Sequence, residues 1–319
     1  MTLTILVIAD PGDATLARLP GVGSGARFVV GGRLEAFDAS VAEADAILLW
    51  SSDVATLKAL VPRAPRLRWV HVWSAGVEGV LSPAIVESPL VLTNARGVYS
   101  RSLAEFALGA MLYFAKDFPR MKASQANRAW DPFDVRMLHR ATLGVIGYGD
   151  IGRAVATLGR ALGMELLALR RRPEKSHADP LAPEVLTSAR EVCARSDYLV
   201  LAAPITKETR HMIGAGELGA MKRDAVLVNV GRGAVVDEAA LVHALQRGEI
   251  RGAALDVFEH EPLPPDHPFF AMPNVLLSPH CADHTPTWRD EAMGCFLENL
   301  RRFLAGETLA NLVEKQSGY

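Results

Sequence analysis

The hydrophobic positions of this chain fall into short runs that end in Gly, Pro or Asp and alternate with stretches of helical spacing. This alternation predicts parallel strands joined by helices, because a crossover helix packs on the sheet that it leaves. In the first hundred residues we expect four strands, at 3–9, 46–50, 69–73 and 90–93. A second series predicts about six more, at 143–146, 166–169, 198–202, 225–230, 252–256 and 275–277.

Two series of strands in 319 residues indicate two domains, because the chain is longer than a single hydrophobic core usually requires. Between the series, apolar residues at helical spacing predict a connecting helix at 102–116, followed by a looser polar segment to residue 138. A last helix is predicted at 290–305. The tail from residue 309 could return to pack on the first domain.

Three glycines follow the predicted strand at 143–146, and a helical pattern begins directly after them. In such a turn the first glycine permits a tight bend, the second leaves room for a pyrophosphate, and the third lets the helix pack on the strand. The N–H groups at the start of the helix then face the phosphates. The sequence therefore predicts a dinucleotide site at Gly147, Tyr148, Gly149, Asp150, Ile151 and Gly152.

The next predicted strand ends in Arg170, Arg171 and Arg172, where a dinucleotide-binding fold that uses NAD carries an acidic residue for the adenosine ribose. The planar guanidinium group of arginine suits a 2′-phosphate. We therefore predict NADP(H) as the cofactor. NAD is the alternative if the three arginines form only a solvated loop.

Ionisable residues follow three later strands of the second series, and the carboxyl ends of strands are where open α/β sheets bind ligands. Arg232 stands between two glycines, where it could clamp a carboxylate and polarise the neighbouring carbonyl. Glu261 and His280 follow the next two strands. Histidine suits proton transfer near neutral pH, and a carboxylate would orient its ring. We assign His280 as the acid/base and Glu261 as its partner.

Charge and composition narrow the choice of partners. The 34 basic and 36 acidic side chains leave a net charge of −2, which provides no field to attract nucleic acid or an anionic membrane. The first apolar run is too short for a membrane span and resembles no secretory leader. Three widely spaced cysteines favour a reducing, cytoplasmic location. His280 and His284 lack the helix and glutamate of zinc sites, so we expect no metal.

These motifs resemble those of the D-isomer-specific 2-hydroxyacid dehydrogenases over essentially the whole chain. The resemblance is carried by the glycine turn, Asn229-Val-Gly-Arg232-Gly, Leu255-Asp256-Val-Phe-x-x-Glu261-Pro262-Leu and Ser278-Pro-His280. It implies that Arg232, Glu261 and His280 are catalytic and that Asp256 lies near the nicotinamide carboxamide. It also implies an α/β fold of two doubly wound parallel-sheet domains, one flavodoxin-like and one Rossmann-type, with the cleft between them.

The resemblance further implies that residues 1–99 and 286–319 form a substrate-binding domain, into which a dinucleotide-binding domain of residues 100–285 is inserted. Substrate contacts are expected from Trp50, Ala75, Gly76, Val77 and Arg232, with loop N–H groups on the substrate carboxylate. Additional cofactor contacts are expected from Ala203, Pro204, Thr209, Val230, Gly231, Asp256 and Ala282. Cys281 and Ala282 replace the usual Ile-Gly after the histidine, which leaves the contacts there in doubt. The resemblance also implies a homodimer, with residues 102–138 at the contact.

The expected activity is the NADPH-dependent reduction of a small 2-ketoacid, of glyoxylate or hydroxypyruvate type, to the D-2-hydroxyacid. Trp50 carries the substrate prediction, because it resembles a tryptophan of bacterial glyoxylate/hydroxypyruvate reductases and could cap a small pocket. Packing in the core is the alternative role for this side chain. A dehydrogenase with another substrate, for example a phosphoglycerate-like one, and a non-enzymatic NAD(P)(H)-sensing protein are the alternatives. Formate dehydrogenases resemble this family but carry glutamine where Glu261 stands, which argues against that activity.

Overall fold

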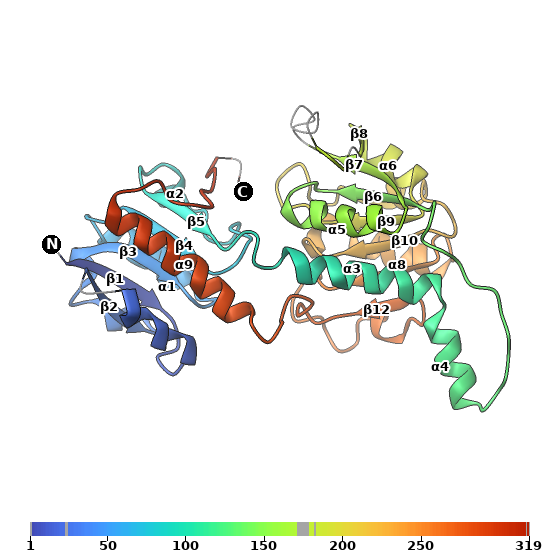
Figure 1. Ribbon diagram of the computed structural model, residues 1–319, viewed down its shortest axis with the longest axis horizontal. Coiled ribbons are helices and arrows are strands. Elements are labelled where there is room, and N and C mark those ends of the chain that lie inside the picture. Colours follow the sequence, from blue (N-terminus) through green and yellow to red (C-terminus); the bar gives the residue numbers. More distant parts are fainter. Residues whose placement is uncertain (1, 23–24, 171–178, 182, 317, 319) are drawn as a thin grey trace. The chain divides into compact units, whose positions relative to one another are not determined.

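The chain folds into two compact units, each built on its own β-sheet. The computed structural model describes residues 2–22, 25–170, 179–181, 183–316 and 318 (Figure 1). The five-stranded unit contains Met1–Val98 and Pro286–Tyr319, and the seven-stranded unit contains Tyr99–Thr285. Neighbouring strands are parallel in both sheets, which confirms the predicted α/β class.

The sheet of the five-stranded unit has the order β2-β1-β3-β4-β5. Its strands are β1 (Leu3–Ile8), β2 (Ala26–Gly31), β3 (Ala44–Leu49), β4 (Trp69–Val72) and β5 (Val91–Asn94). The prediction of four strands missed β2. This strand lies at the edge of the sheet and is only half-buried, so its sequence lacks the continuous apolar run of β1 and β3.

Short helices and one long one cover this sheet: η1 (Ala14–Val22), η2 (Leu34–Phe37), η3 (Val41–Glu43), α1 (Val54–Leu60), η4 (Val61–Arg63), α2 (Pro83–Val86) and α9 (Trp288–Ala305). Figure 1 shows α9 lying along β4, where Phe296 stacks on Trp69 with ring centroids 5.4 Å apart. The tail returns to the same unit, because Leu312 forms an antiparallel bridge with Thr93.

The sheet of the seven-stranded unit has the order β12-β11-β10-β9-β6-β7-β8. Its strands are β6 (Thr142–Ile146), β7 (Glu165–Leu169), β8 (Glu184–Leu186), β9 (Tyr198–Leu201), β10 (Val226–Asn229), β11 (Gly252–Leu255) and β12 (Val275–Leu277). The chain moves outward from β6 to β8 and then crosses back to β9 on the other side of β6. The strand order therefore reverses between β6 and β9, the position where such sheets bind ligands.

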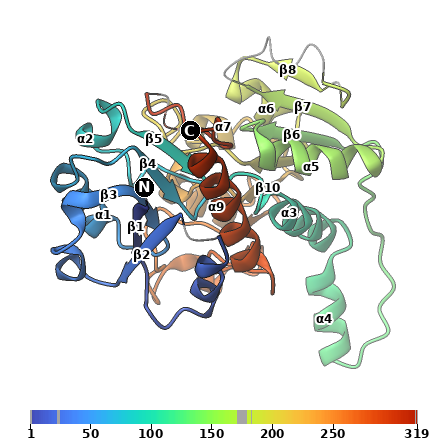
Figure 2. The same cartoon turned by 60° about the vertical axis from the view of Figure 1, so that its left-hand side comes forward.

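The helices of this unit are α3 (Ser100–Ala115), α4 (Phe118–Ala126), α5 (Asp150–Ala161), α6 (Ala189–Arg195), α7 (Ala215–Leu218), η6 (Gly233–Val235), α8 (Glu238–Gln246) and η7 (Pro268–Ala271). The looser polar segment predicted after residue 116 contains α4, which buries no residue and so shows no apolar face in the sequence. In both views α4 and the segment after it project from the rest of the unit (Figures 1 and 2). No helix in the described part of the chain is long and apolar enough to cross a membrane.

Candidate functional site

The glycine turn after β6 has three different geometric demands. Gly147 has a φ of +91°, and a Cβ added there would lie 2.4 Å from the backbone nitrogen of Ala203. A Cβ on Gly152 would lie 2.3 Å from the carbonyl oxygen of Gly147. At Gly149 a Cβ would meet nothing within 4 Å, so the turn faces open space there. Tyr148 packs beneath the turn, while Asp150 and Ile151 begin α5 and leave its first N–H groups available to an anion.

Two neighbouring strands deliver further predicted cofactor residues to the same edge of the sheet. Ala203 and Pro204 follow β9, and Val230 and Gly231 follow β10; a Cβ on Gly231 would lie 2.8 Å from the carbonyl oxygen of Ala203. Thr209 holds the turn after Pro204 closed, since its Oγ1 donates to the Pro204 carbonyl at 2.7 Å. The structure therefore gathers these residues around the point where the strand order reverses.

The predicted 2′-phosphate site falls partly outside the described residues. Arg171 and Arg172 lie there, whereas Arg170 places its guanidinium carbon 5.8 Å from the ring centre of Tyr148. Burial, together with the carboxylate of Asp179, raises the pKa of Tyr148 to about 12. Asp179 pairs with Arg153 of α5, with Nε and Oδ2 3.3 Å apart. No pattern in the sequence marks this acidic neighbour, because it lies well beyond the end of the strand.

His280 and Glu261 form the hydrogen bond that the sequence predicts. The Nδ1 atom of His280 lies 2.7 Å from Oε2 of Glu261, whose Oε1 accepts from the Phe258 N–H at 2.9 Å. This hydrogen bond, with the charges of Glu261 and Asp256, raises the pKa of His280 above its ordinary 6.5, against the effects of burial and Arg232. Burial raises the pKa of Glu261, but its hydrogen bonds outweigh burial and bring the pKa below its ordinary 4.5.

Arg232 lies on the turn after β10, next to the loop that carries Glu261. Asn229 shapes this turn, since its Nδ2 donates to the Arg232 carbonyl at 3.0 Å and its Oδ1 accepts from the Gly231 N–H at 3.1 Å. A Cβ on Gly233 would lie 1.8 Å from the carbonyl carbon of Phe258, so the two loops touch backbone to backbone. The structure thus brings Arg232, Glu261 and His280 within electrostatic reach of one another.

Asp256 has a structural task that the sequence analysis missed. It is buried, and its Oδ1 accepts from the Ser278 hydroxyl at 2.6 Å and from the N–H groups of Cys281 and Ala282 at 3.0 Å each. These bonds hold the loop that carries His280. Ala282 is also tied to α3 through its carbonyl, which accepts from the hydroxyl of Ser102 at 2.6 Å. The backbone polar groups of Ala282 are therefore engaged within the unit.

Apart from Arg232, the predicted substrate residues lie in the five-stranded unit, after β3 and β4. Trp50 is buried and donates from Nε1 to Oδ2 of Asp13 at 3.0 Å, beside a cavity of about 500 Å³ that Trp73 and Arg289 also line. In the loop after Trp73, the N–H groups at 75–77 meet no acceptor among the described residues. The side chain of Val77 is buried in the core, so only its backbone can face a ligand.

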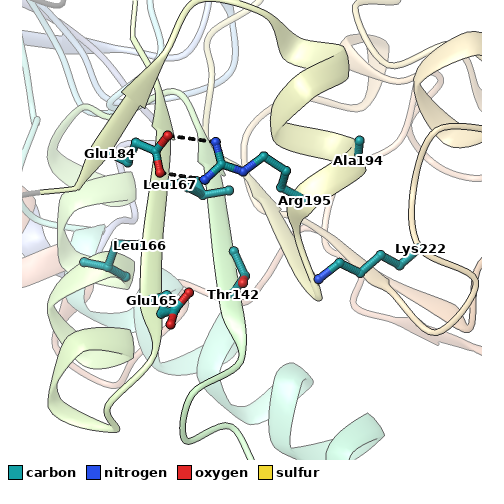
Figure 3. Close-up of a pocket in the computed structure, with 8 residues that line it drawn as sticks. All are labelled: Thr142, Glu165, Leu166, Leu167, Glu184, Ala194, Arg195 and Lys222. Carbon is teal, nitrogen blue, oxygen red and sulfur yellow. Dashed lines mark hydrogen bonds and ion pairs between the residues drawn. The ribbon is translucent and has the colours of Figure 1, made fainter.

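A second cavity, of about 360 Å³, lies in the seven-stranded unit, at the amino-terminal ends of three strands (Figure 3). Thr142, Glu165 and Glu184 border it as the first residues of β6, β7 and β8, and Arg195 pairs with both carboxylate oxygens of Glu184. It contains none of the predicted site residues. No group of three or more His, Cys, Asp or Glu side chains in the described ranges is arranged to hold a metal ion.

Comparisons with known proteins identify the family. The family profile described as D-isomer specific 2-hydroxyacid dehydrogenase, NAD binding domain, matches residues 108–282. A glyoxylate reductase from Aeropyrum pernix is 38% identical over 266 residues, which are 81% of this chain and 79% of that protein. A D-3-phosphoglycerate dehydrogenase from Methanocaldococcus jannaschii is 34% identical over 86% of this chain. The chain spans about half the length of that dehydrogenase, 52%.

Solved structures share the whole fold. The crystal structure of an NADPH-dependent glyoxylate/hydroxypyruvate reductase from Sinorhizobium meliloti, in complex with NADP and sulfate, matches with a TM-score of 0.85. The match covers 100% of both chains at 26% sequence identity.

Proposed function

Because the chain belongs to the D-isomer-specific 2-hydroxyacid dehydrogenase family of NAD(P)-dependent oxidoreductases, we propose that it reduces a small 2-ketoacid with NADPH. Glyoxylate and hydroxypyruvate are the proposed substrates, and the D-2-hydroxyacid is the product. The observation that carries the proposal is the 2.7 Å hydrogen bond between His280 and Glu261, formed next to Arg232. A ketone reduction needs a proton at oxygen, and this pair can supply it.

The proton step follows from the orientation of the imidazole ring. Glu261 accepts from Nδ1–H of His280, which leaves Nε2 to carry the proton that goes to the ketone oxygen. The raised pKa of His280 favours the protonated ring, which is the form that the reduction requires. Arg232 would bind the substrate carboxylate and polarise the carbonyl, and the loop N–H groups of Ala75, Gly76 and Val77 would bind the carboxylate as well.

The dinucleotide fits the turn after β6. The open space beside Gly149 and the first N–H groups of α5 suit a pyrophosphate, and we assign Ala203, Pro204, Thr209, Val230, Gly231 and Ala282 to the nicotinamide half. When bound, NADPH supplies the hydride that goes to the carbonyl carbon. The three arginines at 170–172 and the NADPH-dependent relative from Sinorhizobium meliloti support NADP over NAD.

A second substrate is favoured by one observation. The relative from Methanocaldococcus jannaschii is named a phosphoglycerate dehydrogenase, so a phosphorylated 2-ketoacid is the alternative. The test is a panel of 2-ketoacids, with glyoxylate, hydroxypyruvate and 3-phosphohydroxypyruvate, each assayed with NADPH and NADH. If the protein binds the cofactor but turns over none of these 2-ketoacids, the proposed reductase activity is wrong and the protein is a cofactor-sensing protein. His280→Ala with wild-type turnover would overturn the mechanism.

We also propose that the protein is a cytoplasmic homodimer that pairs through residues 102–138. The projecting part of this segment exposes large apolar side chains: Trp130 is 97% and Met137 67% accessible. A monomer exposing them to water would leave that apolar area unburied, whereas a second copy would cover it. The cytoplasmic location rests on the three free cysteines.

A further inference from the structure

A second group of ionisable side chains holds the loop that presents Glu261. Glu238, the first residue of α8, accepts from the backbone N–H of Glu259 with its Oε2 at 3.1 Å. Its other oxygen, Oε1, lies 3.2 Å from Nε2 of His267. The side chains of Glu238 and His267 are only 16% and 17% exposed, so this carboxylate has little freedom to move.

The side chain of Glu259 is fixed from another direction. Its Oε1 lies 2.8 Å from Nε2 of His211, and the backbone N–H of His211 donates to the carbonyl of Ala234 at 2.8 Å. Ala234 belongs to η6, the turn directly after Arg232. Glu259 is therefore held between α8 and the turn that carries Arg232, while Gly233 lets that turn touch the backbone of residues 258 and 259.

Glu261 depends on this arrangement because it follows Glu259 by two residues and must bond in two directions. Its Oε1 accepts from the Phe258 N–H and its Oε2 meets His280. A hydrogen bond weakens steeply once the distance or angle departs from its preferred range. A small displacement of the loop would therefore separate Glu261 from His280 without removing either residue.

We propose that Glu238 is a positioning residue for the reduction: by holding the Glu259 N–H, it keeps Glu261 in hydrogen-bond contact with His280. None of the atoms of Glu238 contacts the catalytic pair directly, and its effect passes through the loop at 258–261. The proposal rests on the proposed function, because its effect on turnover can be measured only if the protein is a reductase. Its effect on the pKa of His280 can be measured whatever the protein catalyses.

The test compares Glu238→Ala with Glu238→Gln, which keeps an amide oxygen for the Glu259 N–H. The pKa of His280 is followed by NMR in protein with labelled histidine, and its resonance is assigned with His280→Asn. Besides Glu261, the charged groups that act on His280 are Asp256, Arg232 and Asp283, and all of them remain in both variants. We expect Glu238→Ala to lower the pKa of His280 and to reduce kcat/KM about tenfold or more.

Glu238→Gln should largely preserve the pKa of His280 and kcat/KM, because its amide oxygen can still accept from the Glu259 N–H. The control is Glu43→Ala, which removes an exposed glutamate of η3 that pairs only with Arg27 among the described residues. A Glu238→Ala protein whose His280 titration and kcat/KM match this control would overturn the proposal. So would a Glu238→Gln protein as impaired as the alanine variant. A shifted titration in an enzyme that turns over no 2-ketoacid would refute the proposed function and leave the positioning role standing.

A second variant keeps the test decisive if Glu238→Ala does not fold. His211 has a φ of +52°, a backbone conformation that asparagine adopts more readily than most residues. His211→Asn keeps that conformation but is too short to reach Glu259. The expected result is a change of the same sign and smaller size in both readouts. An unchanged pKa of His280 in a folded His211→Asn protein would contradict the proposed positioning of the loop at 258–261.

Discussion

At the scale of the residue, the proposed role of His280 as the proton donor predicts how the reduction depends on pH. The protonated ring is the reactive form in reduction, so kcat/KM should fall as pH rises through this pKa. Because Glu261 holds the pKa above 6.5, the fall should come above that pH. In the direction of oxidation the neutral ring is reactive, and the rate should rise through the same pKa.

Removing the charge of Glu261 should therefore shift both pH profiles, the falling limb of reduction and the rising limb of oxidation. In Glu261→Gln the pKa of His280 drops, so the falling limb of the reduction shifts to lower pH and kcat/KM at neutral pH falls by about a hundredfold. The measurement is kcat/KM against pH, in parallel with Glu43→Gln as a charge-matched control. A limb that stays in place would mean that Glu261 does not set the titration of His280.

Cofactor choice is a second residue-scale question. If Arg170 binds the 2′-phosphate, Arg170→Asp should lower the ratio of kcat/KM for NADPH to that for NADH about tenfold or more, the usual effect of losing a hydrogen bond to a charged group. Arg101→Asp makes the same charge reversal on an exposed side chain of α3 and should leave the ratio unchanged. Equal use of both cofactors by the unmodified enzyme would show that the arginines belong to a solvated loop and do not select the cofactor.

At the scale of the element, the contact between two loops depends on a missing side chain. In Gly233→Ala the new Cβ would overlap the backbone of Phe258, which cannot rotate away as a side chain can. We expect a loss of about 3 kcal/mol or more in the free energy of unfolding. Gly216→Ala is the matched control, because Gly216 lies on α7 with nothing within 4 Å of the added Cβ and should gain about 0.4–1 kcal/mol. Urea titrations of both variants measure the difference.

Most of the strands, and the grouping of Arg232, Glu261 and His280, could be predicted from the sequence because both leave a local pattern. Strands such as β12 coincide with their apolar runs, and Arg232, Glu261 and His280 each follow one. The edge strands β2 and β8 and the helix α4 were missed because their faces are half-buried or fully exposed. The bonds that hold the catalytic loops join Asp256 to Cys281 and Glu238 to Glu259. Such pairs lie far apart in sequence and have no periodicity to find.

At the scale of the whole molecule, the projecting segment after α3 makes oligomerisation testable. If residues 102–138 form the dimer contact, Trp130→Asp should place a charge in it and shift the protein toward monomer in sedimentation velocity. Leu312→Asp is the control, because it places the same charge on an exposed apolar residue of the other unit. A monomeric unmodified protein, or a Trp130→Asp dimer as stable as the parent, would contradict the proposal.

The five-stranded unit is assembled from both ends of the chain, and this determines when it can form during synthesis. Its sheet needs α9 to cover Trp69, and Lys315 donates to the carbonyls of Ile85 and Leu90 at 3.0 and 2.9 Å. The seven-stranded unit is one unbroken segment, so it can fold on the ribosome while the first 98 residues still wait for their partner helix. A premature stop codon after residue 285 would therefore expose the core of the domain that was translated first.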